Sequence, residues 1–172
     1  RLKERIELEF VPENEESSAV RWMPLAVGRV EIDAEQVATF ASQTVVLEGA
    51  VDLVGLSPRA LEICTSMRVD AVLPSGERRR LLNIPDWDHH QRESYIPVLP
   101  IRLPAGTALV ASFDLDNTSG NPRNPDDPAA AIRRGRRTGI LNVIIHVAAV
   151  DPAFDDDLVS AGDRLSRSLM RR

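Results

Sequence analysis

The strongest constraint on the fold is a period-two alternation of apolar and polar side chains, repeated in short segments along the chain. In one such segment, Met67, Val69 and Ala71 alternate with Arg68 and Asp70. This period is typical of a strand with one buried and one solvent-facing side. A helix does not use it, because apolar positions on one helix face recur every three or four residues.

The spacing of these segments predicts an all-β protein. Pro, Gly, Asn and Asp separate them at short intervals, which favours a sandwich or barrel over alternating strands and helices. A short helical turn is expected at residues 33–40. The predicted strands are residues 6–10, 20–25, 27–32, 44–56, 67–73, 80–84, 95–101, 108–115 and 140–150.

The last stretch of the chain has a different pattern, typical of a helix. Three aspartates open it, arginines close it, and Leu158, Leu165 and Leu169 fall on one stripe. This charge order complements a helix dipole. We therefore expect residues 1–152 to form one sandwich domain and residues 153–172 a helical extension. The stripe covers either its own sandwich or a partner protein, so its leucines are candidate partner-binding residues.

Composition narrows the choice of partners. The chain has 172 residues, with 21 basic side chains scattered among 26 acidic ones and a net charge of −5. We expect no basic face that could bind phosphates, and so we do not expect nucleic acid to be a partner. No apolar run reaches the roughly 20 residues of a membrane-spanning helix. The single cysteine, Cys64, cannot form an internal disulfide, and a buried thiol is expected.

Residues 116–137 predict a long, proline-rich loop that ends in a basic cluster. The cluster consists of Arg133, Arg134, Arg136 and Arg137. Long loops are either solvated connections or interaction surfaces. As an interaction surface, the cluster would favour an acidic protein partner or lipid head groups. The Asp and Asn residues of the loop are expected to cap turns.

Several short motifs follow one another in a fixed order. They are Leu82-Asn83-Ile84-Pro85-Asp86-Trp87-Asp88, Tyr95, Leu103-Pro104-Ala105-Gly106-Thr107, Asp116-Asn117 and Asn121-Pro122-Arg123-Asn124-Pro125. Each motif is short, but their order and separations together resemble the C-terminal domain of copper type II, ascorbate-dependent monooxygenases. The resemblance implies an antiparallel β-sandwich of the jelly-roll type.

The resemblance also implies a copper site, and this sequence departs from it. In the family, two histidines of a His-Met-His run and a later methionine hold the copper, a soft ligand set that suits Cu(I). The histidine positions fall on Arg59 and Leu61, and the methionine position falls on Leu141. None of these side chains is a metal ligand. We therefore expect neither copper nor catalytic residues here.

The three histidines of the chain offer the alternative metal site. His89 and His90 are adjacent, and His146 lies within an apolar segment. Neighbours on a strand point to opposite faces, so His89 and His90 share a metal only if they lie in a turn. For His146, a hydrogen-bonded side chain in a strand is the expected role.

Two functions from different classes follow. The first is a non-catalytic module, a structural or protein-binding part of a periplasmic, otherwise extracytoplasmic, or membrane-associated assembly. The second is part of a copper-dependent monooxygenase whose metal is bound elsewhere. A small-molecule carrier is a weaker third, because aromatic residues make up 4% of the chain. The expected location rests on the resemblance alone.

Overall fold

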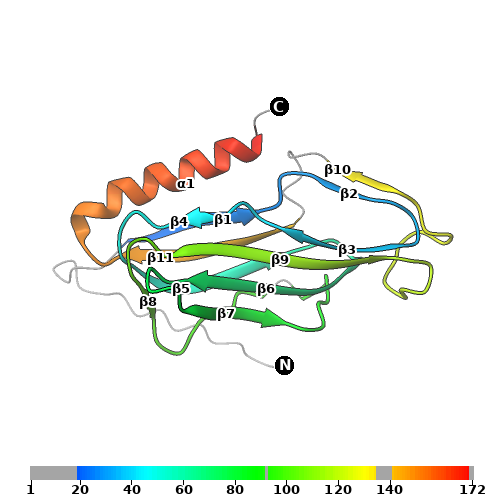
Figure 1. The fold of residues 1–172 in the computed structure, drawn as a ribbon, viewed down its shortest axis with the longest axis horizontal. Coiled ribbons are helices and arrows are strands. Elements are labelled where there is room, and N and C mark those ends of the chain that lie inside the picture. The colour runs from blue at the N-terminus through cyan, green and yellow to red at the C-terminus, as the bar shows by residue number, and fades with distance from the viewer. Residues whose placement is uncertain (1–18, 92, 135–140, 171–172) are drawn as a thin grey trace, which may run out of the picture.

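The computed structural model describes residues 19–91, 93–134 and 141–170, which form two packed antiparallel sheets and a helix (Figure 1). The first sheet has the order β1 (Val20–Ala26), β11 (Asn142–Ala149), β5 (Val51–Arg59), β8 (Ile101–Leu103). The second has the order β3 (Gln36–Ala41), β9 (Ala108–Asn117), β6 (Cys64–Val72), β7 (Arg78–Ile84), with β4 (Val45–Val46) also paired to β9. A small ribbon joins β2 (Val30–Ile32) to β10 (Ile132–Arg134).

The chain passes back and forth between the two main sheets. After β5 in the first sheet come β6 and β7 in the second, then β8 in the first, β9 in the second and β11 in the first again. All the pairings are antiparallel, and apart from the β6–β7 hairpin the paired strands are not consecutive in the chain. The prediction of a jelly-roll-type antiparallel β-sandwich with a C-terminal helix is confirmed.

The core lies between the sheets and follows the alternation in the sequence. In β9, Leu109, Ala111, Phe113 and Leu115 are fully buried, while the residues between them are partly exposed. Burial of one such large apolar side chain stabilises the fold by about 1.5–3 kcal/mol. Trp87, from the segment after β7, is also in this core and is 2% exposed.

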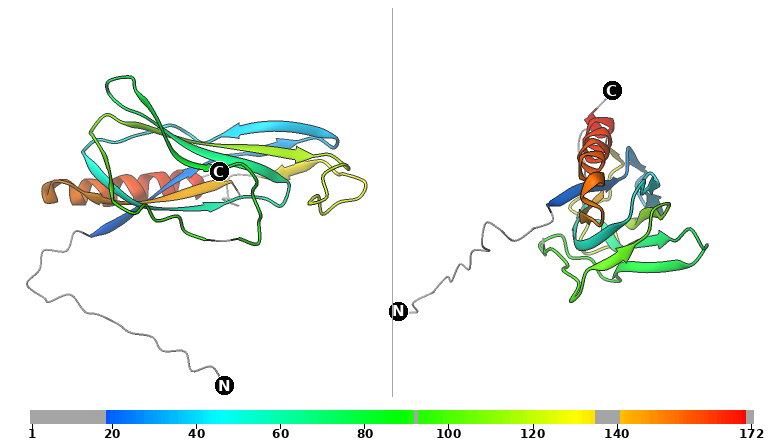
Figure 2. Two further views of the ribbon diagram at one scale, coloured as in Figure 1. Left: turned by 90° about the horizontal axis from the view of Figure 1, so that it is seen from below. Right: turned by 90° about the vertical axis from the view of Figure 1, so that its left-hand side faces the viewer.

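The helix α1 (Asp155–Met170) follows a short 3-10 turn, η2 (Pro152–Phe154), and lies along β1 (Figures 1 and 2). The side chain of Asp151 accepts a hydrogen bond from the amide of Ala153 and so caps the turn. Because β1 ends the first sheet, α1 covers a strand at a sheet edge. The helix predicted near the end of the sequence is thus present, while the division into two parts at residue 152 stays a prediction. Within the part of the chain described here, no helix is both long and apolar enough to cross a membrane.

Three local predictions are wrong. Residues 44–56 are not one strand, because β4 ends at Val46 in the second sheet and β5 begins at Val51 in the first. Residues 33–40 do not form a helical turn: Glu35, with a φ of 59°, reverses the chain, and β3 follows. Residues 95–101 are not one strand, because Tyr95 makes an isolated bridge to Leu56 and β8 begins only at Ile101. The prolines within that stretch remove ladder donors, which explains the interruption. The strand predicted at residues 6–10 lies outside the described residues.

Candidate functional site

The three positions that the resemblance aligns with copper ligands lie around one end of the β5–β11 ladder. Arg59 ends β5 and is the register partner of Asn142, so it lies beside Leu141. Leu141 is fully buried, and Leu61 is half-buried in the turn after β5. Two apolar side chains and one exposed guanidinium occupy these positions. Such a set offers no lone pair to a metal ion.

His146 has the structural role expected of it. It lies in β11, where its Nε2 atom is 2.7 Å from Oγ of Ser57, and that hydroxyl is 2.7 Å from Oγ of Ser94. Its ring packs over Gly55, where an added Cβ would lie 3.4 Å from the imidazole. These two hydrogen bonds tie Ser94 to β5 and β11 of the first sheet. The prediction of a hydrogen-bonded histidine in a strand is confirmed.

His89 and His90 lie in a turn that follows Trp87. The amide of Gln91 donates to the carbonyl of Asp88 at 3.0 Å, which closes the turn. The two imidazole rings are 3.8 Å apart between centroids and tilted by 42°. His89 and His90 therefore lie in a turn, which is the condition under which two neighbouring histidines can bind the same metal ion.

The basic cluster is divided by the structure. In β10, the guanidinium of Arg133 donates to the carbonyl of Ile32 at 3.0 Å and forms an ion pair with Asp33. Its charge is therefore partly compensated within the sandwich. Arg134 belongs to the same strand. Arg136 and Arg137 lie outside the described residues, so their part in a partner surface stays a prediction.

The leucine stripe of α1 packs against its own sandwich. Leu158 is 1% exposed and belongs to the core, and half-buried Leu165 packs against that core. Partner binding by these leucines stays a prediction, because within this chain both of them pack onto the sandwich. The physical reason is the exposed edge of the first sheet, which the stripe covers. Leu169 lies in α1, and its side chain is outside the described part.

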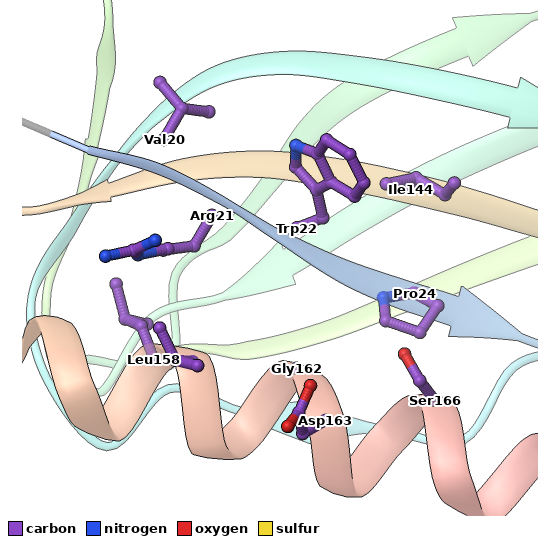
Figure 3. A pocket seen from close by; sticks show the side chains of 10 residues that line it. Val20, Arg21, Trp22, Pro24, Ile144, Leu158, Gly162, Asp163 and Ser166 are labelled. Carbon is purple, nitrogen blue, oxygen red and sulfur yellow. The ribbon is translucent and has the colours of Figure 1, made fainter.

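A groove runs between α1 and the outer face of the first sheet (Figure 3). On the sheet side, Trp22 is 69% exposed and stands beside further apolar side chains. We call this feature the β1–α1 groove. Its lining consists of Val20, Arg21, Trp22, Pro24, Ile144, Leu158, Val159, Gly162, Asp163 and Ser166. A large exposed aromatic ring in an apolar groove is a typical feature of a binding surface.

The charged side chains near this groove differ in whether they are already paired within the chain. Nε of Arg21 donates to Asp155 at 2.8 Å, and the two side chains form an ion pair. The hydrogen bond and the positive charge of Arg21 lower the pKa of Asp155. Asp163 is exposed and forms no ion pair with any described residue. The groove therefore presents one uncompensated negative charge beside its apolar wall.

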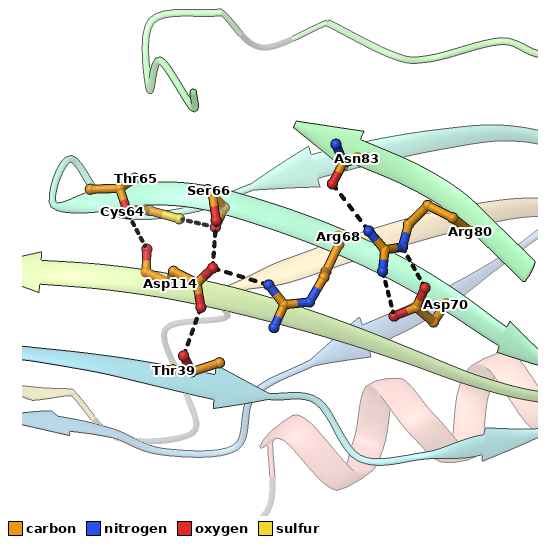
Figure 4. Close-up of polar contacts among 9 residues, drawn as sticks. All are labelled: Thr39, Cys64, Thr65, Ser66, Arg68, Asp70, Arg80, Asn83 and Asp114. Atoms are coloured by element: carbon orange, nitrogen blue, oxygen red, sulfur yellow. Dashed lines mark hydrogen bonds and ion pairs between the residues drawn. The ribbon is translucent and has the colours of Figure 1, made fainter. Parts of the chain in front are cut away.

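A polar network on the second sheet has a structural explanation (Figure 4). Asp114 accepts hydrogen bonds from Thr39 at 2.7 Å, Ser66 at 2.5 Å and Arg68 at 3.1 Å. These groups come from β3, β6 and β9, so the carboxylate joins three neighbouring strands. Burial acts to raise the pKa of Asp114, but the three partners outweigh it and lower that pKa. Every member has a partner, which fits a stabilising role.

The buried thiol predicted for the single cysteine is confirmed. Cys64 is fully buried at the start of β6, and its Sγ lies 3.3 Å from the carbonyl of Ser66. Burial and the nearby charge of Asp114 raise the pKa of the thiol to about 12. At neutral pH this sulfur is protonated and a poor nucleophile.

The asparagines and aspartates of the long loop cap its turns, as predicted. The carboxylate of Asp116 accepts from the amide of Thr118 at 3.0 Å, and Oδ1 of Asn121 accepts from the amide of Arg123 at 3.0 Å. Asn117 is fully buried and donates to the carbonyls of Asp33 and Ala130. These bonds hold the loop against the sandwich.

Comparison with known proteins identifies no family for this chain. No protein-family model matches the chain, and no curated protein matches it. Three similar solved chains come from infectious bursal disease virus. The Gx strain chain has a TM-score of 0.34 and 10% identity, with 86% of this chain and 41% of that chain covered. The corresponding values are 0.33, 10%, 86% and 42% for the VP2 subviral particle, and 0.28, 8%, 89% and 48% for the Gt strain.

This chain thus spans less than half the length of each of these viral chains. With TM-scores of this size, the likeness carries no information on function.

The β1–α1 groove was not predicted from the sequence, although one signal was present. In β1, Met23 and Leu25 point into the core, and the opposite face carries Val20, Trp22 and Pro24. A strand that is apolar on both faces is expected only where both faces are covered. Here α1 leaves Trp22 largely uncovered.

Proposed function

We propose that this chain is a non-catalytic β-sandwich module that binds a protein partner through the β1–α1 groove. In this proposal, the module is a structural or protein-binding part of an extracytoplasmic or membrane-associated assembly. It is related to the copper type II monooxygenase C-terminal domain but lacks that domain's copper ligands. The cellular location in this proposal rests on the resemblance alone.

The observation that carries the proposal is the exposure of Trp22. Tryptophan is rarely left in solvent on a monomer, and it is enriched among the residues that dominate binding energy. Trp22 lines the groove on the β1 side together with Val20 and Pro24, and residues of α1 line the other side. A segment laid in the groove would remove all of this apolar surface from water at once.

The charge of the groove indicates the chemistry of the partner. Asp163 faces the groove without an ion-pair partner among the described residues. The exposed indole of Trp22 offers a face on which a cation can stack. We therefore expect an apolar peptide segment that carries a lysine or arginine. An acidic segment would be repelled.

The non-catalytic part of the proposal has separate support. At the positions where the related enzymes hold copper, this chain has Arg59, Leu61 and Leu141, and Leu141 is part of the packed core. The single thiol is buried and protonated. The polar cluster around Asp114 is satisfied by its neighbours and is explained by strand pairing.

Peptide display tests the proposal directly. A random library would be selected on the immobilised wild-type protein and counter-selected on a Trp22→Ser variant. The proposal expects enriched peptides with aliphatic residues next to Lys or Arg, and at least tenfold weaker binding to Trp22→Ser. A Val37→Ser variant is the matched control, because Val37 is equally exposed at 68% but lies on β3. Selected peptides that bind both variants like the wild type would overturn the proposal.

A further inference from the structure

The turn after Trp87 brings three metal-binding side chains together. One ligand atom from each of Asp88, His89 and His90 lies within 4.8 Å of the other two. Oδ1 of Asp88 is 3.1 Å from Nδ1 of His90 and 4.0 Å from Nδ1 of His89. Ligand atoms about 2.1 Å from a tetrahedral zinc ion are roughly 3.4 Å apart, a value that lies between these two distances.

The turn is anchored, so the three side chains are held near this arrangement. Trp87 is buried in the core, and its carbonyl accepts a hydrogen bond from Arg123 at 2.7 Å. The amide of His90 donates to Oδ1 of Asp88 at 2.9 Å. Arg123 is itself paired with Asp86, so Asp88 is left to the two histidines. A rigid support of this kind reduces the cost of assembling a metal site.

One nitrogen of the cluster has no protein partner to explain its position. Nδ1 of His89 is buried and has no hydrogen-bond partner among the residues that the structure describes. A buried polar atom without a partner costs free energy, and a bound ion is one way to satisfy it. The His90 ring is 78% exposed, which leaves the site open to solvent and to an entering ion.

We propose that Asp88, His89 and His90 form an open site for one divalent late transition-metal ion such as Zn²⁺. The two imidazole nitrogens and the carboxylate oxygen supply three ligands, and water completes the coordination shell. This donor set suits zinc, nickel and copper(II) rather than calcium or magnesium, which prefer oxygen. The site is independent of the β1–α1 groove and differs from the family's copper positions.

The chain provides its own control for this proposal, because it has three histidines and the site uses two of them. Zn²⁺ would be titrated into the full chain while the imidazole NMR signals are recorded. We expect the signals of His89 and His90 to shift to a saturating end point at one ion per chain. The signal of His146, which is hydrogen-bonded to Ser57, should stay in place.

Variants then assign the ligands by calorimetric Zn²⁺ titration. His89→Gln, His90→Gln and Asp88→Asn should each weaken binding by about tenfold or more, the range found when metal-site partners are removed. His146→Gln should bind Zn²⁺ like the wild type. Signals of His89 and His90 that do not move, or equal losses in His89→Gln and His146→Gln, would overturn the proposal. The NMR test uses the unaltered chain, so it holds even if a variant fails to fold.

Discussion

The backbone carbonyl oxygen of Trp22 lies 2.6 Å from the point that a Cβ atom would occupy at Gly162. The helix α1 therefore meets the backbone of β1 at a distance that only glycine allows. The same contact sets how far Trp22 stands from the helix, and so defines the width of the β1–α1 groove (Figure 3).

Replacement of this glycine should destabilise the protein. In a free helix, Gly→Ala is favourable by about 1 kcal/mol. In Gly162→Ala, however, the new methyl group meets backbone rather than a flexible side chain, so we expect a net loss of about 1–3 kcal/mol. Urea denaturation measures it. Ser160→Ala, at an exposed position of the same helix, should be neutral or stabilising. A Gly162→Ala protein as stable as Ser160→Ala would contradict the close contact.

The ion pair between Arg21 and Asp155 should make stability depend on pH. Its hydrogen bond and charge lower the pKa of Asp155 in the folded protein. Such a carboxylate stabilises the fold above its unfolded-state pKa, and this contribution is lost as the pH falls through the folded-state pKa. We expect the wild type to be more stable than Asp155→Asn at pH 7. The difference should shrink below about pH 4.

Urea denaturation at pH 7 and pH 3 checks this expectation. Asp156→Asn is the control, because Asp156 is the next, exposed residue of the same helix turn. If the wild type and Asp155→Asn differed in free energy of unfolding by the same amount at both pH values, the charge of Asp155 would not contribute to stability through Arg21.

Removal of the carboxylate that joins three strands should be costly. Asp114→Ala leaves the hydroxyls of Thr39 and Ser66 and the guanidinium of Arg68 without their acceptor (Figure 4). Loss of hydrogen bonds at a charged, partly buried group predicts a decrease in the free energy of unfolding of about 1–3 kcal/mol. Thermal or urea denaturation measures it. Asp126→Ala, in the exposed loop, should change stability by less than about 0.5 kcal/mol.

Cys64 should be inert in the folded protein. Its pKa of about 12 and its complete burial leave almost no accessible thiolate at pH 8. A thiol reagent such as Ellman's should react with less than one tenth of the protein in native buffer, and with one thiol per chain in urea. Rapid reaction of the native protein, at the rate of a small thiol, would contradict the buried position at the start of β6.

The sequence was sufficient for features that depend on local pattern. Alternation such as that of Leu109, Ala111 and Phe113 predicts both a strand and its buried face, and the charge order of residues 155–170 predicts α1. The fully buried Asn117 and the capping Asp116 also lie where turn chemistry indicates.

Features that depend on contacts between distant segments were not predictable in this way. The groove exists because α1 meets β1, about 140 positions away, and the pattern of the helix does not say which strand it covers. Glu35 adopts a positive φ, a conformation that favours glycine or asparagine. A glutamate at this position gives no sign of such a turn, so the sequence predicts a helical turn at residues 33–40 instead. The imidazole rings of His89 and His90 lie close together because of a turn that Trp87 anchors, and no short-range sequence pattern predicts this turn.

Fluorescence of a single-tryptophan protein tests the proposed binding surface most directly. The chain has two tryptophans, and Trp87→Phe leaves only Trp22 as the reporter. A peptide selected on the wild type would be titrated into this variant. The account predicts a saturable blue shift of Trp22 emission at one peptide per chain. It also predicts no shift for the Trp22→Phe variant, whose remaining Trp87 is buried. Binding that leaves the emission of Trp22 unchanged would contradict the assignment of the β1–α1 groove as the binding surface.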